Sequence, residues 1–118
     1  MKELNLTVVT KKVGEDAVVS QLPNTVDAFQ GFVGGYLSTQ RVFANDPAVL
    51  LVCNEEAKEL NLPKNFPFYE EESGEKIDMI RGDFCFVGCD AEGAFCSLTK
   101  QQAERCLTYC SRIVVSAG

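Results

Sequence analysis

Hydrophobic and polar residues alternate along the first part of the chain, which is the pattern of a strand with one buried face. Leu4, Leu6 and Val8 recur at every second position and predict a strand over roughly 4–11. Turn-forming residues occupy 13–16, and the apolar residues of 17–20 follow. The two segments are expected to form a β-hairpin.

Three later segments have β-forming composition, and a fourth, partly hydrophobic stretch is expected to be irregular. The segment 36–43 is rich in β-branched and aromatic residues, and 76–80 is expected to be a short extended segment. The run 48–53 is apolar throughout, which is typical of a strand buried on both faces. The stretch 61–69 contains two prolines, and it is expected to be irregular.

The segment 83–89 is the strongest strand candidate. Strand alternation sends Phe84 and Phe86 to one face and Cys85, Val87 and Cys89 to the other. Because both faces are apolar, this strand is expected to be central in the sheet.

Two main helices are predicted. The first begins after Asn24, whose side chain suits an N-cap, and ends at 34–35, where glycine accepts the left-handed conformation of a helix end. A short helix capped by Asn54 is expected to run to about Leu60.

The last helix is the best-specified element. Thr99 and Gln102 have the spacing of a capping box, and Leu98 and Ala103 occupy the hydrophobic-staple positions beside it. One face then carries apolar residues at helical spacing, namely Ala103, Cys106, Leu107, Cys110, Ile113 and Val114. These elements together predict an α+β fold in a single domain over 1–118, with a mixed, mainly antiparallel sheet of about five strands and two main helices packed against it.

The charge balance argues against two classes of partner. The chain has 11 basic and 17 acidic residues, and its net charge is −6. Nucleic-acid binders need clustered Lys and Arg to neutralise phosphates, and acidic membrane surfaces attract basic segments. Neither direct nucleic-acid binding nor membrane binding is therefore expected.

The cysteines indicate a reducing compartment. No secretory signal or membrane-length apolar segment is visible, so a cytoplasmic location is expected, with free thiols that act as small hydrophobes. Four of the thiols have paired C-x3-C spacing and make zinc the alternative. Buried thiols are favoured, because these four lie on core faces of regular elements, and no metal or other cofactor is expected. The six cysteines are Cys53, Cys85, Cys89, Cys96, Cys106 and Cys110.

The chain contains no histidine, which removes the imidazole base of Ser-His-Asp and Cys-His catalysis. A nucleophilic Cys53 is the remaining enzymatic alternative for a thiol, because it precedes a predicted helix start that would stabilise a thiolate. No catalytic residue is assigned.

Two polar clusters are the candidate binding sites. Asn54, Glu55, Glu56 and Lys58 follow a buried strand, at the sheet end where ligands often bind. The alternative for them is a capped surface helix with a Glu55–Lys58 ion pair. The second cluster consists of Asp78, Arg81 and Asp83, for which ordinary charge pairing at a strand start is the alternative to metal binding or acid–base chemistry.

Six stretches occur in a characteristic order along the chain: Phe29–Tyr36, Cys53–Lys58, Leu62–Asn65, Ile80–Phe84, Val87–Gly88 and Ser97–Thr99. Together they resemble a family of uncharacterised small domains encoded by bacteria, phages and conjugative elements. Ala57 departs from the family pattern, which tends to have glycine there. The resemblance implies a host-cytosolic protein of mobile-element type and supplies no catalytic residues.

The function expected from these features is that of a non-enzymatic protein-binding or regulatory accessory module, acting on a host protein. One alternative is a small-molecule or nucleotide binder that uses the 53–58 region. The other is a small enzyme that uses carboxylates or Cys53.

Overall fold

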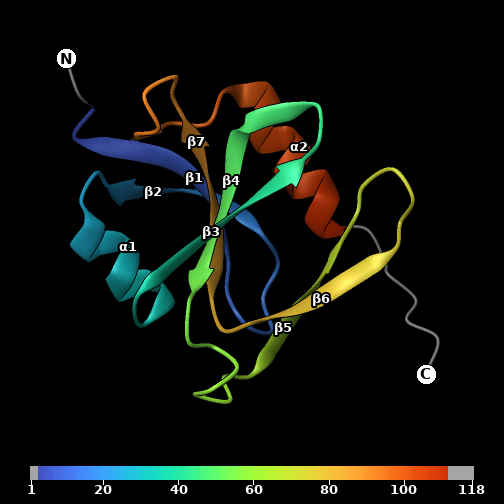
Figure 1. Ribbon diagram of the computed structural model, residues 1–118. Helices are drawn as coiled ribbons and strands as arrows, with labels where there is room; N and C mark the ends of the chain where they lie inside the picture. Colours follow the sequence, from blue (N-terminus) through green and yellow to red (C-terminus); the bar gives the residue numbers. More distant parts are fainter. Residues whose placement is uncertain (1–2, 112–118) are drawn as a thin grey trace.

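The computed structural model describes residues 3–111. Its main layer is a six-stranded sheet in which every strand pair is antiparallel. The strands follow the order β2-β1-β7-β4-β3 (Figure 1). The short β8 pairs with β7 beyond the end of β1. The α+β class is therefore confirmed. The strands are β1 (Asn5–Lys11), β2 (Val18–Pro23), β3 (Leu37–Phe43), β4 (Asp46–Asn54), β7 (Phe84–Cys89) and β8 (Phe95–Cys96).

A second, two-stranded sheet corrects the prediction for 61–69. Most of that stretch is β5 (Lys64–Tyr69), which pairs with β6 (Lys76–Arg81) in a hairpin. Proline is tolerated in β5 because β6 is the only strand within 3–111 that pairs with it, so a missing N–H on the other side costs no ladder bond. Phe66 and Phe68 are buried, in the alternation expected of a strand with one core face.

Helix α1 (Val26–Val33) begins one residue later than predicted. Thr25, not Asn24, is the N-cap, and its Oγ1 accepts a hydrogen bond from the Ala28 N–H at 3.1 Å. The Asn24 side chain instead donates to the Glu3 carbonyl at 2.9 Å. Gly34 ends the helix with a φ of 82°, as predicted for a glycine cap.

Helix α2 (Lys100–Ser111) confirms the predicted capping box. The Gln102 N–H donates to Thr99 Oγ1 at 3.1 Å, and the Thr99 N–H donates to Gln102 Oε1 at 2.9 Å. Ile113 and Val114 of the predicted apolar stripe lie outside the described residues. The short helix predicted from Asn54 is wrong, because the following residues form successive turns. No helix within 3–111 is long and apolar enough to cross a membrane.

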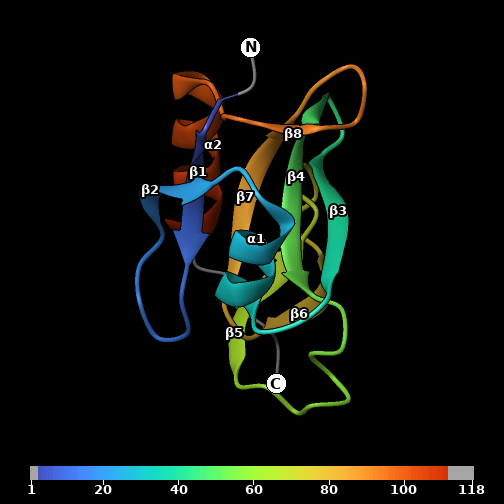
Figure 2. The same ribbon diagram turned by 90° about the vertical axis from the view of Figure 1, so that its left-hand side faces the viewer.

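The sheet separates two apolar cores. In Figure 2, α1 lies in front of the sheet, and α2 and the β5–β6 hairpin lie behind it. One core lies under α1 and includes Cys85 and Val87; the other lies under α2 and the β5–β6 hairpin and includes Phe84 and Phe86. The predicted division of β7 into two apolar faces is therefore confirmed, as is its central place between β1 and β4.

The sheet also separates the cysteine pairs considered for zinc. Cys85 is buried on the α1 side, whereas Cys106 is buried on the α2 side. All six cysteines are free, and within 3–111 no group of three or more potential metal ligands gathers. Burial is incomplete, because Cys89, Cys96 and Cys110 are only half-buried.

Two tyrosines fasten the β5–β6 hairpin to α2. The rings of Tyr69 and Tyr109 stack with centroids 4.1 Å apart. Tyr109 Oη donates to the Tyr69 carbonyl at 2.7 Å and accepts from the Tyr69 N–H at 2.9 Å, while Tyr69 Oη donates to the Tyr109 carbonyl at 2.7 Å. An ion pair between Arg105 and Glu71 lies beside this contact, and the Arg105 guanidinium stacks over Phe43. The hairpin is thus held over the face of the main sheet.

Candidate functional site

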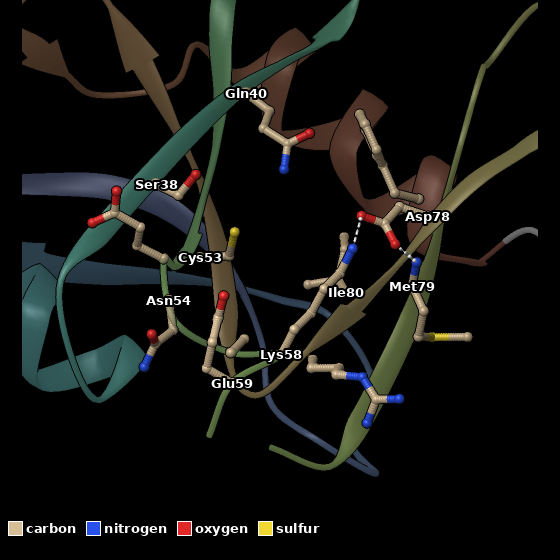
Figure 3. A pocket seen from close by; sticks show the side chains of 13 residues that line it. Ser38, Gln40, Cys53, Asn54, Lys58, Glu59, Asp78, Met79 and Ile80 are labelled. Carbon is tan, nitrogen blue, oxygen red and sulfur yellow. Dashed lines mark hydrogen bonds and ion pairs between the residues drawn. The ribbon is translucent and has the colours of Figure 1, made fainter. Parts of the chain in front are cut away.

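A pocket of about 220 Å³ lies between the β3–β4 face and the β5–β6 hairpin. Figure 3 shows the Cys53 sulfur pointing into it, with Ser38 and Gln40 on one side and Lys58 and Asp78 on the other. We call it the Cys53 pocket. Its residues come from four segments: 38 and 40 on β3, 53–59 from the end of β4 into the turns that follow it, Phe68 on β5, and 78–81 on β6.

The structure brings members of the two predicted polar clusters together here. Asn54, Glu55 and Lys58 of the first cluster and Asp78 and Arg81 of the second all line the Cys53 pocket. The other two predicted residues are not among its lining residues. Glu56 is exposed, and Asp83 Oδ1 accepts a hydrogen bond from the Val13 N–H at 2.9 Å.

Lys58 links the two clusters directly. Its Nζ lies 2.9 Å from Asp78 Oδ2, so the i,i+3 pair with Glu55 is not formed. The hydrogen bond from Lys58 and one from the Met79 N–H lower the pKa of Asp78. Both side chains remain largely exposed, so the pair contributes about 1 kcal/mol or less to stability.

Asn54 positions the turns that carry Glu55 and Lys58. Its amide is buried, donating to the Val33 carbonyl at 3.2 Å and accepting from the Glu56 N–H at 2.8 Å. A Cβ at Gly35 would lie 2.8 Å from Asn54 Nδ2, so glycine is needed for this close approach. Because its polar atoms are already bonded to backbone, Asn54 acts on the pocket by holding its wall.

Cys53 is a neutral group at the base of the pocket. Its residue is only 8% exposed. Burial raises the pKa of the Cys53 thiol; hydrogen bonds with Gln40 and Ser38 offset part of that increase, and the nearby Asp78 carboxylate adds to it. The sulfur is therefore a protonated thiol at neutral pH, which makes it a poor nucleophile.

A second pocket of about 440 Å³ neighbours the first, and Phe68 lines both. We call it the Ile77 pocket, after the exposed apolar side chain on its β6 wall. Its other walls are formed by the β3–β4 turn with Phe43 and Pro47, and by the acidic turn 70–72. Both pockets are lined by residues of β3 and of the β5–β6 hairpin, and we call the two together the groove. The second half of this groove is not expected from the sequence, because the prolines of 61–69 predict an irregular stretch where β5 forms one of its walls.

Comparison with known proteins places the chain in a family. A family profile described as "Domain of unknown function (DUF3846)" matches residues 6–111. The chain belongs to the DUF3846 family. The resemblance to a family of unknown function is thereby confirmed, while a phage or mobile-element origin stays a prediction.

One curated relative of this DUF3846 domain is a protein of Sinorhizobium fredii named "Putative cysteine synthase". It is 33% identical over 102 residues, which cover 82% of this chain and 30% of the relative. Because the chain spans less than a third of that protein, the relative's name describes a much longer molecule. No solved structure matches the chain.

Four of the stretches that carry the family resemblance meet at this end of the DUF3846 domain, in two pairs. The Tyr36 carbonyl accepts from the Glu55 N–H at 2.8 Å, which joins the first stretch to the second. Arg81 Nη1 donates to the Leu62 carbonyl at 3.1 Å, and the Gly82 N–H donates to the Pro63 carbonyl at 2.8 Å. Hydrogen bonds between these stretches, one from a side chain and two within the backbone, therefore hold the segments that line the Cys53 pocket.

The outer edge of β3 is open. β3 ends the main sheet, and no strand within 3–111 pairs with its other side. Residues of an antiparallel pair alternate between those bonded across the pair and those whose backbone groups point away. Since Tyr36 and Glu55 are bonded across the pair, the register makes the backbone N–H and C=O groups of Leu37, Thr39 and Arg41 point away from β4.

Proposed function

We propose that this domain is a protein-binding module that takes an extended segment of another protein as an added strand on β3. The observation that carries the proposal is the open edge of β3 running beside a groove. Added strands gain affinity from main-chain hydrogen bonds and specificity from pockets for alternate side chains. β3 offers outward backbone groups at three positions, and the Cys53 and Ile77 pockets lie along it.

The charge of the groove favours a basic segment. Glu55 and Glu59 beside the Cys53 pocket, and Glu70 and Glu72 beside the Ile77 pocket, form no ion pair with the residues of 3–111. The groove's cations are fewer: Lys58 is ion-paired, which leaves Arg41 and Arg81. A basic partner is also attracted by the net charge of −6, which raises the rate of association.

The other expected functions have less support. Small-molecule sites commonly enclose roughly 300–1,000 Å³, whereas the Cys53 pocket encloses about 220 Å³. An enzymatic role for Cys53 needs a thiolate, and burial keeps this thiol protonated. That the partner is a host protein stays a prediction.

Two substitutions at Thr39 test strand addition. Thr39 is exposed, and its N–H is one of those that face away from β4. Thr39→Pro removes that donor, whereas Thr39→Ala keeps it. Peptides of about nine residues, a length that fits one strand, are selected on the unchanged domain from a random library. We expect Thr39→Ala to bind them normally and Thr39→Pro to bind them about tenfold or more weakly, by fluorescence anisotropy.

The stability of both variants is the control. Because proline is tolerated on the solvent side of an edge strand, Thr39→Pro is expected to unfold within about 1 kcal/mol of Thr39→Ala. Equal binding by the two variants would rule out strand addition. A dimer that forms with rising concentration and is lost in Thr39→Pro would make the occupant a second copy of the chain, which would overturn the partner assigned here.

A further inference from the structure

The groove has two compartments of different chemistry on one face of β3. The side chains of Ser38 and Gln40 border the Cys53 pocket, and Val42 borders the Ile77 pocket. Side chains alternate along a strand, so Ser38 and Gln40 share the face that looks toward the β5–β6 hairpin, whereas Val42 lies where the β3–β4 register shifts. A strand added beside β3 has alternate side chains on that same face.

The Cys53 pocket suits a cationic side chain. Hydrogen-bond acceptors are available there on Ser38, Gln40 and the unpaired carboxylates of Glu55 and Glu59. Of its two cations, Lys58 is paired with Asp78, and Arg81 donates to the neutral Leu62 carbonyl and keeps its charge, so the two carboxylates outnumber the unpaired cation. A lysine or arginine side chain can lay its alkyl stem along the pocket wall and keep its charge at the wet carboxylate rim.

The Ile77 pocket suits an apolar side chain. Ile77 is 62% exposed although it is a large hydrophobic residue. Phe43 and Phe68, which also line this pocket, belong to the core beneath it. Covering such a surface with an apolar side chain removes it from water, which is favourable.

We propose that the recognised segment carries a basic residue and a large apolar residue separated by two or four positions. The basic side chain occupies the Cys53 pocket, and the apolar side chain occupies the Ile77 pocket. The even separation follows from the strand, because residues two or four apart share a face and residues one or three apart do not. This inference rests on the proposed strand addition to β3, and it names the partner sequence that the groove selects.

Synthetic peptides in a Thr- and Val-rich background test the spacing. One series places Lys and Leu two or four residues apart, and the matched series places the same residues one or three apart. We expect the even series to bind about tenfold more tightly, by fluorescence anisotropy, because only these peptides fill both pockets. Replacing Lys by Gln in the best peptide should weaken binding about fivefold at low salt and less at high salt, as expected for exposed charges.

Two charge reversals locate the basic residue. Glu59→Lys changes the rim of the Cys53 pocket, while Glu15→Lys makes the same change beside β2, at the opposite end of the main sheet. Only Glu59→Lys is expected to remove the preference for Lys over Gln. Equal binding of the even and odd series, with the sensitivity to Thr39→Pro retained, would overturn the spacing rule and leave strand addition standing. Binding that Thr39→Pro does not affect would overturn both proposals.

Discussion

Raising the pH from 8 to 10 is expected to destabilise the fold by roughly 5 kcal/mol. Burial raises the pKa of Cys85 to about 12 and that of Cys110 to about 12, and it raises the pKa of Cys106 as well. In the unfolded chain a thiol has a pKa of about 8.5. At a pH between the unfolded and folded pKa values, the unfolded state releases protons that the folded state keeps. Each buried thiol therefore lowers the free energy of unfolding by about 1.4 kcal/mol per pH unit.

Stability falls with rising pH because folding raises the pKa values of these thiols. The stabilising contribution of each thiol is complete below its pKa in the unfolded chain and is lost as the pH rises toward its pKa in the folded protein. Chemical denaturation under reducing conditions, repeated from pH 7 to pH 10, measures the effect. The expected loss is comparable to the whole stability of an ordinary domain, about 5–15 kcal/mol, so unfolding of the domain near pH 10 is consistent with it.

A pair of truncations on β7 separates titration from packing. Cys85 and Val87 are both fully buried on the α1 side of the sheet. Cys85→Ala and Val87→Ala each remove core atoms, but only Cys85→Ala removes a titrating group. We expect the pH dependence above pH 9 to become shallower by about 1.4 kcal/mol per unit in Cys85→Ala alone. The same slope in both variants would show that Cys85 does not carry its share of the alkaline loss.

Tyr109→Phe is expected to lower the free energy of unfolding by about 2–4 kcal/mol. The substitution deletes one oxygen that makes two buried hydrogen bonds with the Tyr69 backbone, one as donor and one as acceptor. It leaves the ring stack and the apolar contacts in place. Urea denaturation at pH 7 measures the change.

Tyr36→Phe is the matched control, because it removes the same atom from a side chain that is 65% exposed. Tyr36→Phe should change the free energy of unfolding by no more than about 0.5 kcal/mol. If Tyr109→Phe proves too unstable to study, Tyr69→Phe is the second variant, because it deletes the hydrogen bond from Tyr69 Oη to the Tyr109 carbonyl. Its loss in the free energy of unfolding should lie between those of Tyr109→Phe and Tyr36→Phe. Equal stability of Tyr109→Phe and Tyr36→Phe would mean that the tyrosine contact does not hold the hairpin.

Elements whose pattern is local could be predicted from the sequence. The capping box at Thr99 and the two apolar faces of β7 are examples, because their determinants lie within a few residues. The sequence of β5 carries two opposing signals: its prolines disfavour a strand, whereas the alternation of Phe66 and Phe68 favours one. The irregular stretch predicted from the prolines is wrong. Proline opposes a strand only where its missing N–H has a partner, and this depends on which strand lies alongside.

The candidate site could be predicted only in pieces. The segments 54–58 and 78–83 were both chosen for their polar residues, but nothing local indicated that Lys58 would meet Asp78. That contact requires the β5–β6 hairpin to fold back over the β3–β4 face. The groove depends further on β3 being the last strand of the sheet, and sheet order is set by long-range pairing.

Backbone hydrogen exchange along β3 tests strand addition most directly. Exchange is read residue by residue by NMR, with and without a saturating peptide that has Lys and Leu two residues apart. The account predicts slower exchange at Leu37, Thr39 and Arg41, whose N–H groups face outward, and no change at Ser38 and Gln40, which are already bonded to β4. Peptide saturation with no such alternation along 37–41 would contradict it.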